Sequence, residues 1–156
     1  VMWKSSWVNA VDKWEVGART FRITKDSGRG IIITGNEAWK NYTVSADIAV
    51  QRLNTGGLAV RVQGLNRYYG LVINSSNKLQ LIKVINEVNV LKEIDFNLEY
   101  FKNYKLSLKI KDNVLSAYLE NKLVLEYEDK NNLLDSGAMG LIVEDGTLVT
   151  DEIVVG

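Results

Sequence analysis

Residues 56–74 read GGLAVRVQGLNRYYGLVIN, two runs of alternating polarity joined through Gly64, Leu65 and Asn66. This pattern predicts a β-hairpin, because successive side chains of a strand point to opposite faces. One face is apolar and is expected to enter a core: Leu58, Val60, Val62, Tyr69, Leu71 and Ile73. The other face has the side chains of a shallow polar binding surface: Ala59, Arg61, Gln63, Tyr68, Gly70 and Asn74.

The same alternation recurs along the rest of the chain. It is nearly perfect from Tyr42 to Gln51, which predicts a long half-buried strand. Turn signals at 26–28 and 145–146 predict that the chain reverses at both places. We expect about twelve short strands and no amphipathic helix, which is typical of a β-sandwich or a barrel.

Composition limits the possible functions. The chain has 156 residues, 46% of them hydrophobic, and we expect one domain spanning residues 1–156. Its 19 basic residues balance 19 acidic ones, which argues against nucleic acid as a partner. No apolar run approaches the roughly 20 residues of a membrane helix. We therefore expect a soluble module without a membrane partner, and because the chain starts at Val1 we expect it to be excised from a longer one.

Catalysis by this segment is not expected. Histidine and cysteine are absent, which removes the commonest general base and the thiolate nucleophile. The acidic stretch from Glu93 to Glu99 is similar to the catalytic strand of laminarinase-like enzymes, but its outer carboxylates are six residues apart. Along a strand that spacing is roughly 20 Å, whereas a retaining glycosidase needs about 5 Å. Solvent-facing charges are the preferred interpretation of this stretch.

The order of motifs along the chain carries a family resemblance. The motifs are GNEAWKNYTVSADI from Gly35, GLAVRVQG from Gly57, RYYGL from Arg67, then YKLSLKI, NKLVLEYED, GAMGLIVEDG and TDEIVV. Their succession resembles concanavalin A-like jelly rolls, the laminin-G-like and carbohydrate-binding-module group. It is most similar to the β-sandwich module C-terminal to the catalytic domain of some bacterial ADP-ribosylglycohydrolase-family proteins. The resemblance implies an all-β fold, a two-sheet antiparallel jelly-roll β-sandwich of the concanavalin A-like lectin/glucanase type.

The resemblance also implies a site and a function. Sugars would bind on a concave sheet lined by Arg61, Gln63 and Tyr68, with Trp39 at its edge. The alternative is structural, with Arg61 paired to Asp47 or another acid and Tyr68 covering a neighbouring strand.

The expected function is that of a non-catalytic module appended to a hydrolase. Its ligand would be a carbohydrate or a sugar-like group such as ADP-ribose, and its partner an upstream catalytic domain. The alternative is a protein–protein interaction module that packs on its own catalytic domain or forms a homodimer.

The resemblance finally implies a structural Ca²⁺ between the N-terminal segment and the last strand. Asp151 stands where the family places a carboxylate ligand, and Asp12 lies in the N-terminal segment. The alternative is a pair of surface acids or a salt bridge to Lys13 or Arg22.

Overall fold

The computed structural model describes residues 8–9, 13–16, 21–52 and 54–156. Every regular element among them is a β-strand, and all strand pairs are antiparallel. None of these residues belongs to a helix of the length and hydrophobicity that a membrane span requires. The strands are β1 (Val8–Asn9), β2 (Lys13–Val16), β3 (Phe21–Thr34), β4 (Tyr42–Arg52), β5 (Thr55–Gly64), β6 (Arg67–Asn74), β7 (Lys78–Ile85), β8 (Glu87–Asp95), β9 (Asn103–Lys111), β10 (Val114–Leu119), β11 (Lys122–Glu128) and β12 (Ala138–Val155).

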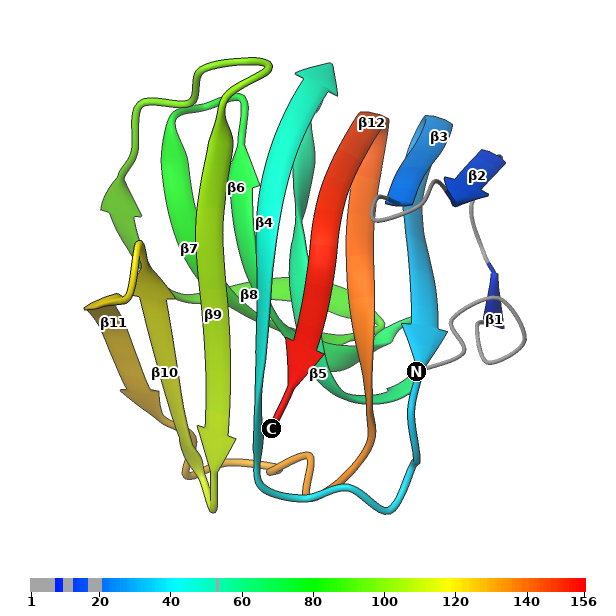
Figure 1. The fold of residues 1–156 in the computed structure, drawn as a ribbon. Coiled ribbons are helices and arrows are strands. Elements are labelled where there is room, and N and C mark those ends of the chain that lie inside the picture. Colours follow the sequence, from blue (N-terminus) through cyan, green and yellow to red (C-terminus); the bar gives the residue numbers. More distant parts are fainter. Residues whose placement is uncertain (1–7, 10–12, 17–20, 53) are drawn as a thin grey trace.

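The long strand β12 joins two layers. Residues 147–155 of β12 pair with β4, in the order β11-β10-β9-β4-β12, whereas residues 138–144 pair with β5, in the order β12-β5-β6-β7-β8. Strand β3 follows β12 on its other edge through both layers. The continuous sheet therefore folds over itself into a sandwich (Figure 1). This confirms the all-β jelly-roll prediction.

The turns predicted at 26–28 and 145–146 are not chain reversals. Both lie inside long strands, β3 and β12, where the pairing register shifts between Glu144 and Gly146. Gly28 has φ +78° and Asp145 has φ 49°, and the Gly28 N–H donates to Asp145 Oδ1 at 2.6 Å. The prediction of chain reversal was therefore wrong at both places, because two irregular segments face each other and the strands continue.

The main core fills the space between the layers. Five of the six residues predicted for the core side of the hairpin lie in it: Leu58, Val60, Tyr69, Leu71 and Ile73. The prediction was wrong for Val62, which belongs to a second apolar cluster on the outer face of the β5–β8 layer. The cause is a bulge between Val60 and Gly64 that interrupts the alternation at Arg61.

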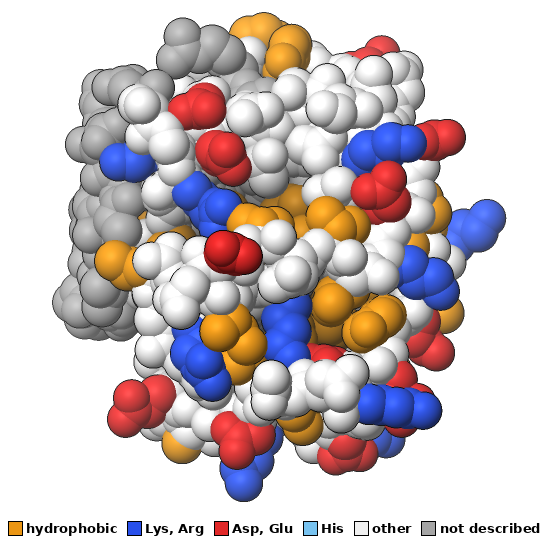
Figure 2. All heavy atoms as spheres, turned by 180° about the vertical axis from the view of Figure 1, so that it is seen from behind, with side chains coloured by type: hydrophobic (Ala, Val, Ile, Leu, Met, Phe, Trp, Pro, Cys, Tyr) orange, Lys and Arg blue, Asp and Glu red, His pale blue; other side chains and the backbone are white. Residues whose placement is uncertain are grey.

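The outer face of the β5–β8 layer is more apolar than predicted. Its cluster is formed by Ile31, Ala59, Val62, Tyr68, Val72, Ile82, Val84 and Ile142, all of them buried. Exposed Val88 and Val90 of β8 pair with Val84 and Ile82 and extend this surface. Figure 2 looks onto the side of the molecule where this layer lies and shows hydrophobic side chains among charged ones. The face is therefore not the open polar surface expected from the sequence.

Candidate functional site

A pocket of about 640 Å³ lies at one end of the sandwich. Three connections meet there: residues 35–41 between β3 and β4, the turn at 112–113 between β9 and β10, and residues 129–137 between β11 and β12. Its lining is mainly polar and charged: Lys40, Asn41, Arg61, Asp112, Asn113, Asp129, Lys130, Leu133 and Asp135. We call this space the end pocket.

Arg61 enters the end pocket because its backbone leaves the strand conformation. Its φ is 49°, within the bulge of β5, and its N–H donates to Tyr42 Oη at 2.7 Å. Left-handed backbone is unfavourable for a residue with a side chain and persists only where neighbours impose it. Here Gly137 packs so closely that a Cβ on it would lie 2.4 Å from the Arg61 carbonyl carbon. Tyr42 and Gly137 therefore hold the bulge in place.

The guanidinium of Arg61 is bound by neutral oxygens. Nε donates to the Lys40 carbonyl at 2.9 Å, Nη1 to the Leu134 carbonyl at 2.9 Å and Nη2 to Asn41 Oδ1 at 3.2 Å. The residue is only 2% exposed, yet it forms no ion pair with a carboxylate of the described residues. Burial lowers its pKa from the ordinary value, although an arginine stays charged in proteins. The nearby carboxylates of Asp135 and Asp112 act to raise that pKa, but neither contacts the guanidinium directly. The end pocket thus has a buried cation on its wall without a direct ion pair.

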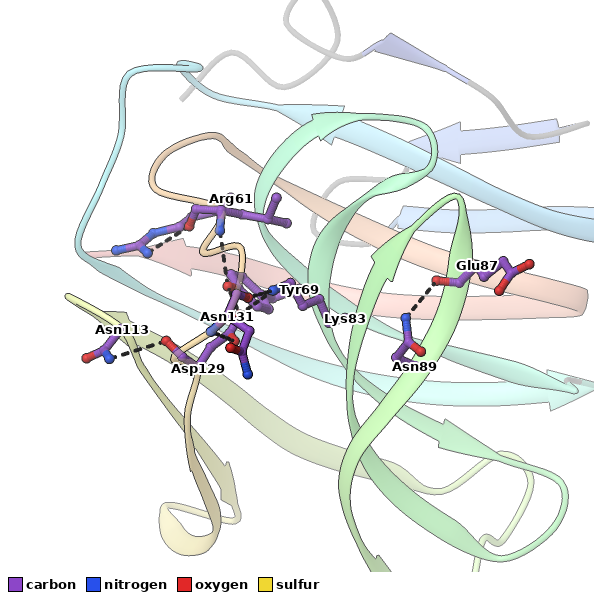
Figure 3. Close-up of polar contacts among 9 residues, drawn as sticks. Arg61, Tyr69, Lys83, Glu87, Asn89, Asn113, Asp129 and Asn131 are labelled. Atoms are coloured by element: carbon purple, nitrogen blue, oxygen red, sulfur yellow. Dashed lines mark hydrogen bonds and ion pairs between the residues drawn. The ribbon is translucent and has the colours of Figure 1, made fainter.

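On the wall of the pocket, Asp129 organises a buried polar cluster that fixes the 129–137 connection (Figure 3). Its carboxylate accepts from Lys83 Nζ at 2.6 Å, from the Tyr69 hydroxyl, and from the Asn131 N–H at 3.1 Å. Burial acts to raise the pKa of Asp129, but the hydrogen bonds from Lys83 and Tyr69 outweigh it and hold that pKa below the ordinary value. Asp129 is therefore an ionised anchor, with Lys83 as its counterion.

The Asp129 cluster connects directly to Arg61. The Tyr69 hydroxyl accepts from the Leu134 N–H at 3.2 Å, and the Leu134 carbonyl accepts from Arg61. Burial and the neighbouring Asp129 raise the pKa of Tyr69, which keeps its phenol protonated. In Figure 3, Tyr69, Lys83, Asp129 and Asn131 lie together, and the Arg61 guanidinium points away from them.

Two other predicted site residues lie next to the pocket without lining it. Gln63 is exposed, donates to the Ser136 carbonyl at 2.9 Å and accepts from Arg67 Nε at 2.7 Å. Trp39 is half-buried, and its ring meets the Tyr42 ring edge-on with centroids 5.4 Å apart. Gln63 therefore holds the 129–137 connection, and Trp39 supports the tyrosine that binds the Arg61 backbone.

Tyr68 lies elsewhere. It is fully buried in the outer apolar cluster, and its hydroxyl accepts from Arg29 Nη1 at 3.4 Å. Burial raises the pKa of Tyr68, as expected for a phenol inside an apolar cluster. The expected common face of Arg61, Gln63 and Tyr68 was wrong, because the bulge turns Arg61 toward the end of the sandwich while Tyr68 stays on the sheet.

Of the two predicted calcium ligands, only Asp151 lies among the described residues. Asp12 lies outside the described residues, and the Asp151 carbonyl accepts from Thr150 Oγ1 at 3.3 Å. Within the described ranges, no group of three or more acidic side chains is arranged to hold a metal ion. A calcium site that includes Asp12 stays a prediction.

The acidic stretch of β8 lies on the surface. Glu93 and Asp95 lie near Lys78, with Glu93 at 4.0 Å from its Nζ, and Glu99 pairs with Lys102 at 3.0 Å. All three carboxylates are exposed. Solvent-facing charges are therefore the correct interpretation of this stretch.

Most pocket residues were missed in the sequence, although some of them left a signal. Lys83, the partner of the lining residue Asp129, follows Leu79 and Leu81 on the inward face of β7, and a charged residue at an inward position predicts a buried partner. The Asp112–Asn113 turn was predicted, but nothing in its local pattern showed which connections it would meet. Lys40, Lys130 and Asp135 are exposed loop residues without any such signal.

The comparisons with known proteins agree on the kind of fold. A family model described as "Galactocerebrosidase, C-terminal lectin domain" matches residues 16–141. No curated protein matches the sequence. The carbohydrate binding module CBM66 from Bacillus subtilis is 19% identical and superimposes with a TM-score of 0.87, covering 96% of this chain and 94% of that one.

Two further solved structures extend the comparison. A protein of unknown function with a galectin-like fold from Bacillus subtilis is 10% identical, with a TM-score of 0.70 over 97% of this chain and 89% of that chain. A sialidase is 9% identical, with a TM-score of 0.71, and the match spans 97% of this chain and 17% of the sialidase. At these identities the likeness shows the fold, a lectin-like β-sandwich.

Proposed function

The chain belongs to the galactocerebrosidase C-terminal lectin domain family, and from this premise we propose that it is a non-catalytic module that binds a carbohydrate in its end pocket. The observation that carries the proposal is the buried Arg61, held by three hydrogen bonds on the wall of that pocket. Membership in a lectin family supports a sugar as the ligand, and the position of Arg61 supports the end pocket as its binding site.

The lining of the end pocket suits a polyhydroxylated ligand. Sugar hydroxyls both donate and accept, so their site needs both kinds of partner. Lys40, Lys130 and Arg61 supply donors, and the carboxylates of Asp112 and Asp135 supply acceptors. Exposed Leu133 offers an apolar contact for the C–H face of a ring.

The outer sheet face is the weaker candidate for this ligand. Its centre is formed by apolar side chains that are buried, and the hydroxyl of Tyr68 is bonded to Arg29. The prediction of a sugar on a concave sheet is therefore replaced by a proposal for the end of the sandwich.

The finer predictions concern the parent chain and the ligand. An appended hydrolase of the ADP-ribosylglycohydrolase type and an ADP-ribose-like ligand both rest on the sequence resemblance, and they stay predictions. The end pocket would suit the ribose hydroxyls of such a ligand by the same donors and acceptors. Adding ADP-ribose to a glycan-binding panel would test this part of the proposal directly.

The experiment is a glycan array followed by calorimetric titration of the best ligand. Lys130→Ala and Asp135→Ala remove exposed pocket side chains, so folding should persist while affinity falls about tenfold or more. The matched control is Lys122→Ala, an exposed lysine at the opposite end of the β10–β11 hairpin, which should bind like the wild type. Binding that all three variants retain would remove the end pocket from the proposal.

A second candidate function is protein interaction, favoured by two adjacent exposed aromatic side chains. Phe101 is 73% exposed and Tyr100 49%, on the β8–β9 connection, whose backbone is held by the Phe101 N–H bond to the Val50 carbonyl at 2.7 Å. Sedimentation would show a mass that rises with concentration in the wild type and not in Phe101→Ser if this surface forms a homodimer. A constant mass in both proteins would count against self-association.

A further inference from the structure

We propose that the ligand of the end pocket is a sugar that carries one negative charge, a carboxylate or a sulfate ester, which pairs with Arg61. This inference rests on the proposed function and specifies its ligand class. It is carried by the charges around the pocket, the partners of Arg61 and the local backbone.

The charges on the pocket wall do not balance. Asp129 lies against Lys83, which is outside the lining, so that carboxylate is already neutralised. The remaining lining residues are three cations, Lys40, Arg61 and Lys130, and two carboxylates, Asp112 and Asp135. One positive charge is left in excess, and a monoanionic ligand would compensate it.

We assign the excess positive charge to Arg61, because it is the least solvent-exposed of the three cations. Lys40, Lys130, Asp112 and Asp135 are exposed, so solvent stabilises their charges. Arg61 is only 2% exposed, and its hydrogen-bond acceptors are two carbonyl oxygens and an amide oxygen. The carboxylates of Asp112 and Asp135 attract the Arg61 guanidinium, but neither forms a direct ion pair with it. A buried cation without a directly paired anion is unfavourable, and an incoming anion relieves this cost.

The guanidinium also retains donors for such a ligand. It has more N–H groups than the three that donate within the described part of the chain. A planar anion such as a carboxylate matches the fork of N–H groups on a guanidinium, and these charged hydrogen bonds are among the strongest in proteins.

The bulge shows that Arg61 is placed before any ligand arrives. Its left-handed backbone is bound by Tyr42, and its guanidinium by the connections at 40–41 and 134. Strain of this kind accumulates where a side chain must be held in one orientation. A pre-placed guanidinium loses little conformational entropy when it binds.

The test compares matched glycosides that differ in one group. Methyl β-D-glucuronide, methyl β-D-glucoside and the 6-sulfate of the glucoside are titrated by calorimetry or NMR at low salt, together with the corresponding galactose series. At least one anionic member should bind about tenfold more tightly than its neutral partner. The preference should shrink as salt is added, because Lys40 and Lys130 are solvent-exposed contributors. The uronate and sulfate arms distinguish the two sources of charge.

In Arg61→Gln, the ratio of the affinities for the anionic and the neutral glycoside should fall close to one. The affinity for the neutral glycoside itself should stay nearly that of the wild type. If this variant fails to fold, Lys130→Gln and Lys40→Gln replace exposed cations and should each reduce the preference severalfold, whereas Lys122→Gln should not. Equal or tighter binding of the neutral glycosides would overturn the inference and leave the proposed function standing. Binding of no glycoside in either series or on the array would overturn both.

Discussion

Lys83 and Arg61 are two buried cations with different kinds of partner. Lys83 faces the interior beside Leu81 of β7 and is paired with Asp129 at 2.6 Å. Arg61 is also buried, and its three hydrogen-bond acceptors are neutral oxygens. Because a buried cation without a directly paired anion is costly, the Lys83–Asp129 pair is a structural anchor, and Arg61 is the residue for which we propose an anionic ligand.

The Lys83–Asp129 pair predicts a loss of stability in acid. The folded-state pKa of Asp129 is below its ordinary value near 3.9. Its contribution is therefore complete above that value and is lost as pH falls through the lower, folded-state pKa. Urea unfolding from pH 7 to pH 2.5 should show stability falling below about pH 4.

The variant Asp129→Asn measures how much of the stability lost in acid is due to Asp129. Asp129→Asn should cost about 3 kcal/mol or more at pH 7, because Lys83 is left buried without its counterion. The variant should also lose less stability than the wild type between pH 4 and pH 2.5. Asp135→Asn, an exposed carboxylate of the same connection, is the control and should follow the wild-type curve. Identical acid slopes in wild type and Asp129→Asn would contradict this account.

The bulge of β5 and the 129–137 connection form one structural unit. Arg61 and Gln63 donate to the carbonyls of Leu134 and Ser136, and Gly137 donates to the Trp39 carbonyl at 2.9 Å. Glycine is needed at position 137 because its φ is +151° and a Cβ there would collide with the backbone of Arg61 and Val62. The irregular part of one strand and an otherwise featureless connection thus determine each other's conformation.

Gly137→Ala and Gly28→Ala separate steric contact from backbone conformation. Both glycines have positive φ, but a Cβ at Gly28 meets nothing within 4 Å, whereas one at Gly137 meets the Arg61 carbonyl carbon at 2.4 Å. Gly28→Ala should cost about 1 kcal/mol, and Gly137→Ala about 3 kcal/mol or more. Denaturant unfolding measures both, and equal costs would show that the close approach at Gly137 is unimportant.

In the whole molecule, the long strands β3 and β12 hold the two layers together. Each passes through both layers, and β12 pairs with β4 at one end and β5 at the other. The predicted calcium ion would act at this level, since it would tie the N-terminal segment to β12 through Asp12 and Asp151. That prediction concerns stability and not the end pocket.

Chelation tests the calcium prediction. If the ion is bound, EDTA should lower the melting temperature by about 3 °C or more, because a ligand specific to the folded state stabilises it. Added Ca²⁺ should restore the original value, and Asp151→Asn should make the protein insensitive to EDTA. A melting temperature that does not respond to EDTA in the wild type would argue against a structural ion.

The sequence by itself determined the all-β class, the antiparallel sandwich and most of the core side of the hairpin, but it divided the long strands β3 and β12 at their irregular segments. Period-two alternation is a local property, and it placed Leu58, Val60, Tyr69, Leu71 and Ile73 on the correct side of the hairpin. It also identified Arg61 and Gln63 as candidate site residues of that hairpin, but the turn residues at 26–28 and 145–146 did not reverse the chain.

Only the tertiary structure decided where those residues act. A single left-handed residue at Arg61 moved Val62 to the outer face and turned the guanidinium away from Tyr68 toward connections 21 and 73 residues distant along the chain. That backbone state depends on Tyr42 and Gly137, which are remote in sequence, so no local pattern could predict it. The end pocket follows from the same long-range packing, because its walls come from three connections that meet only when the two layers fold together.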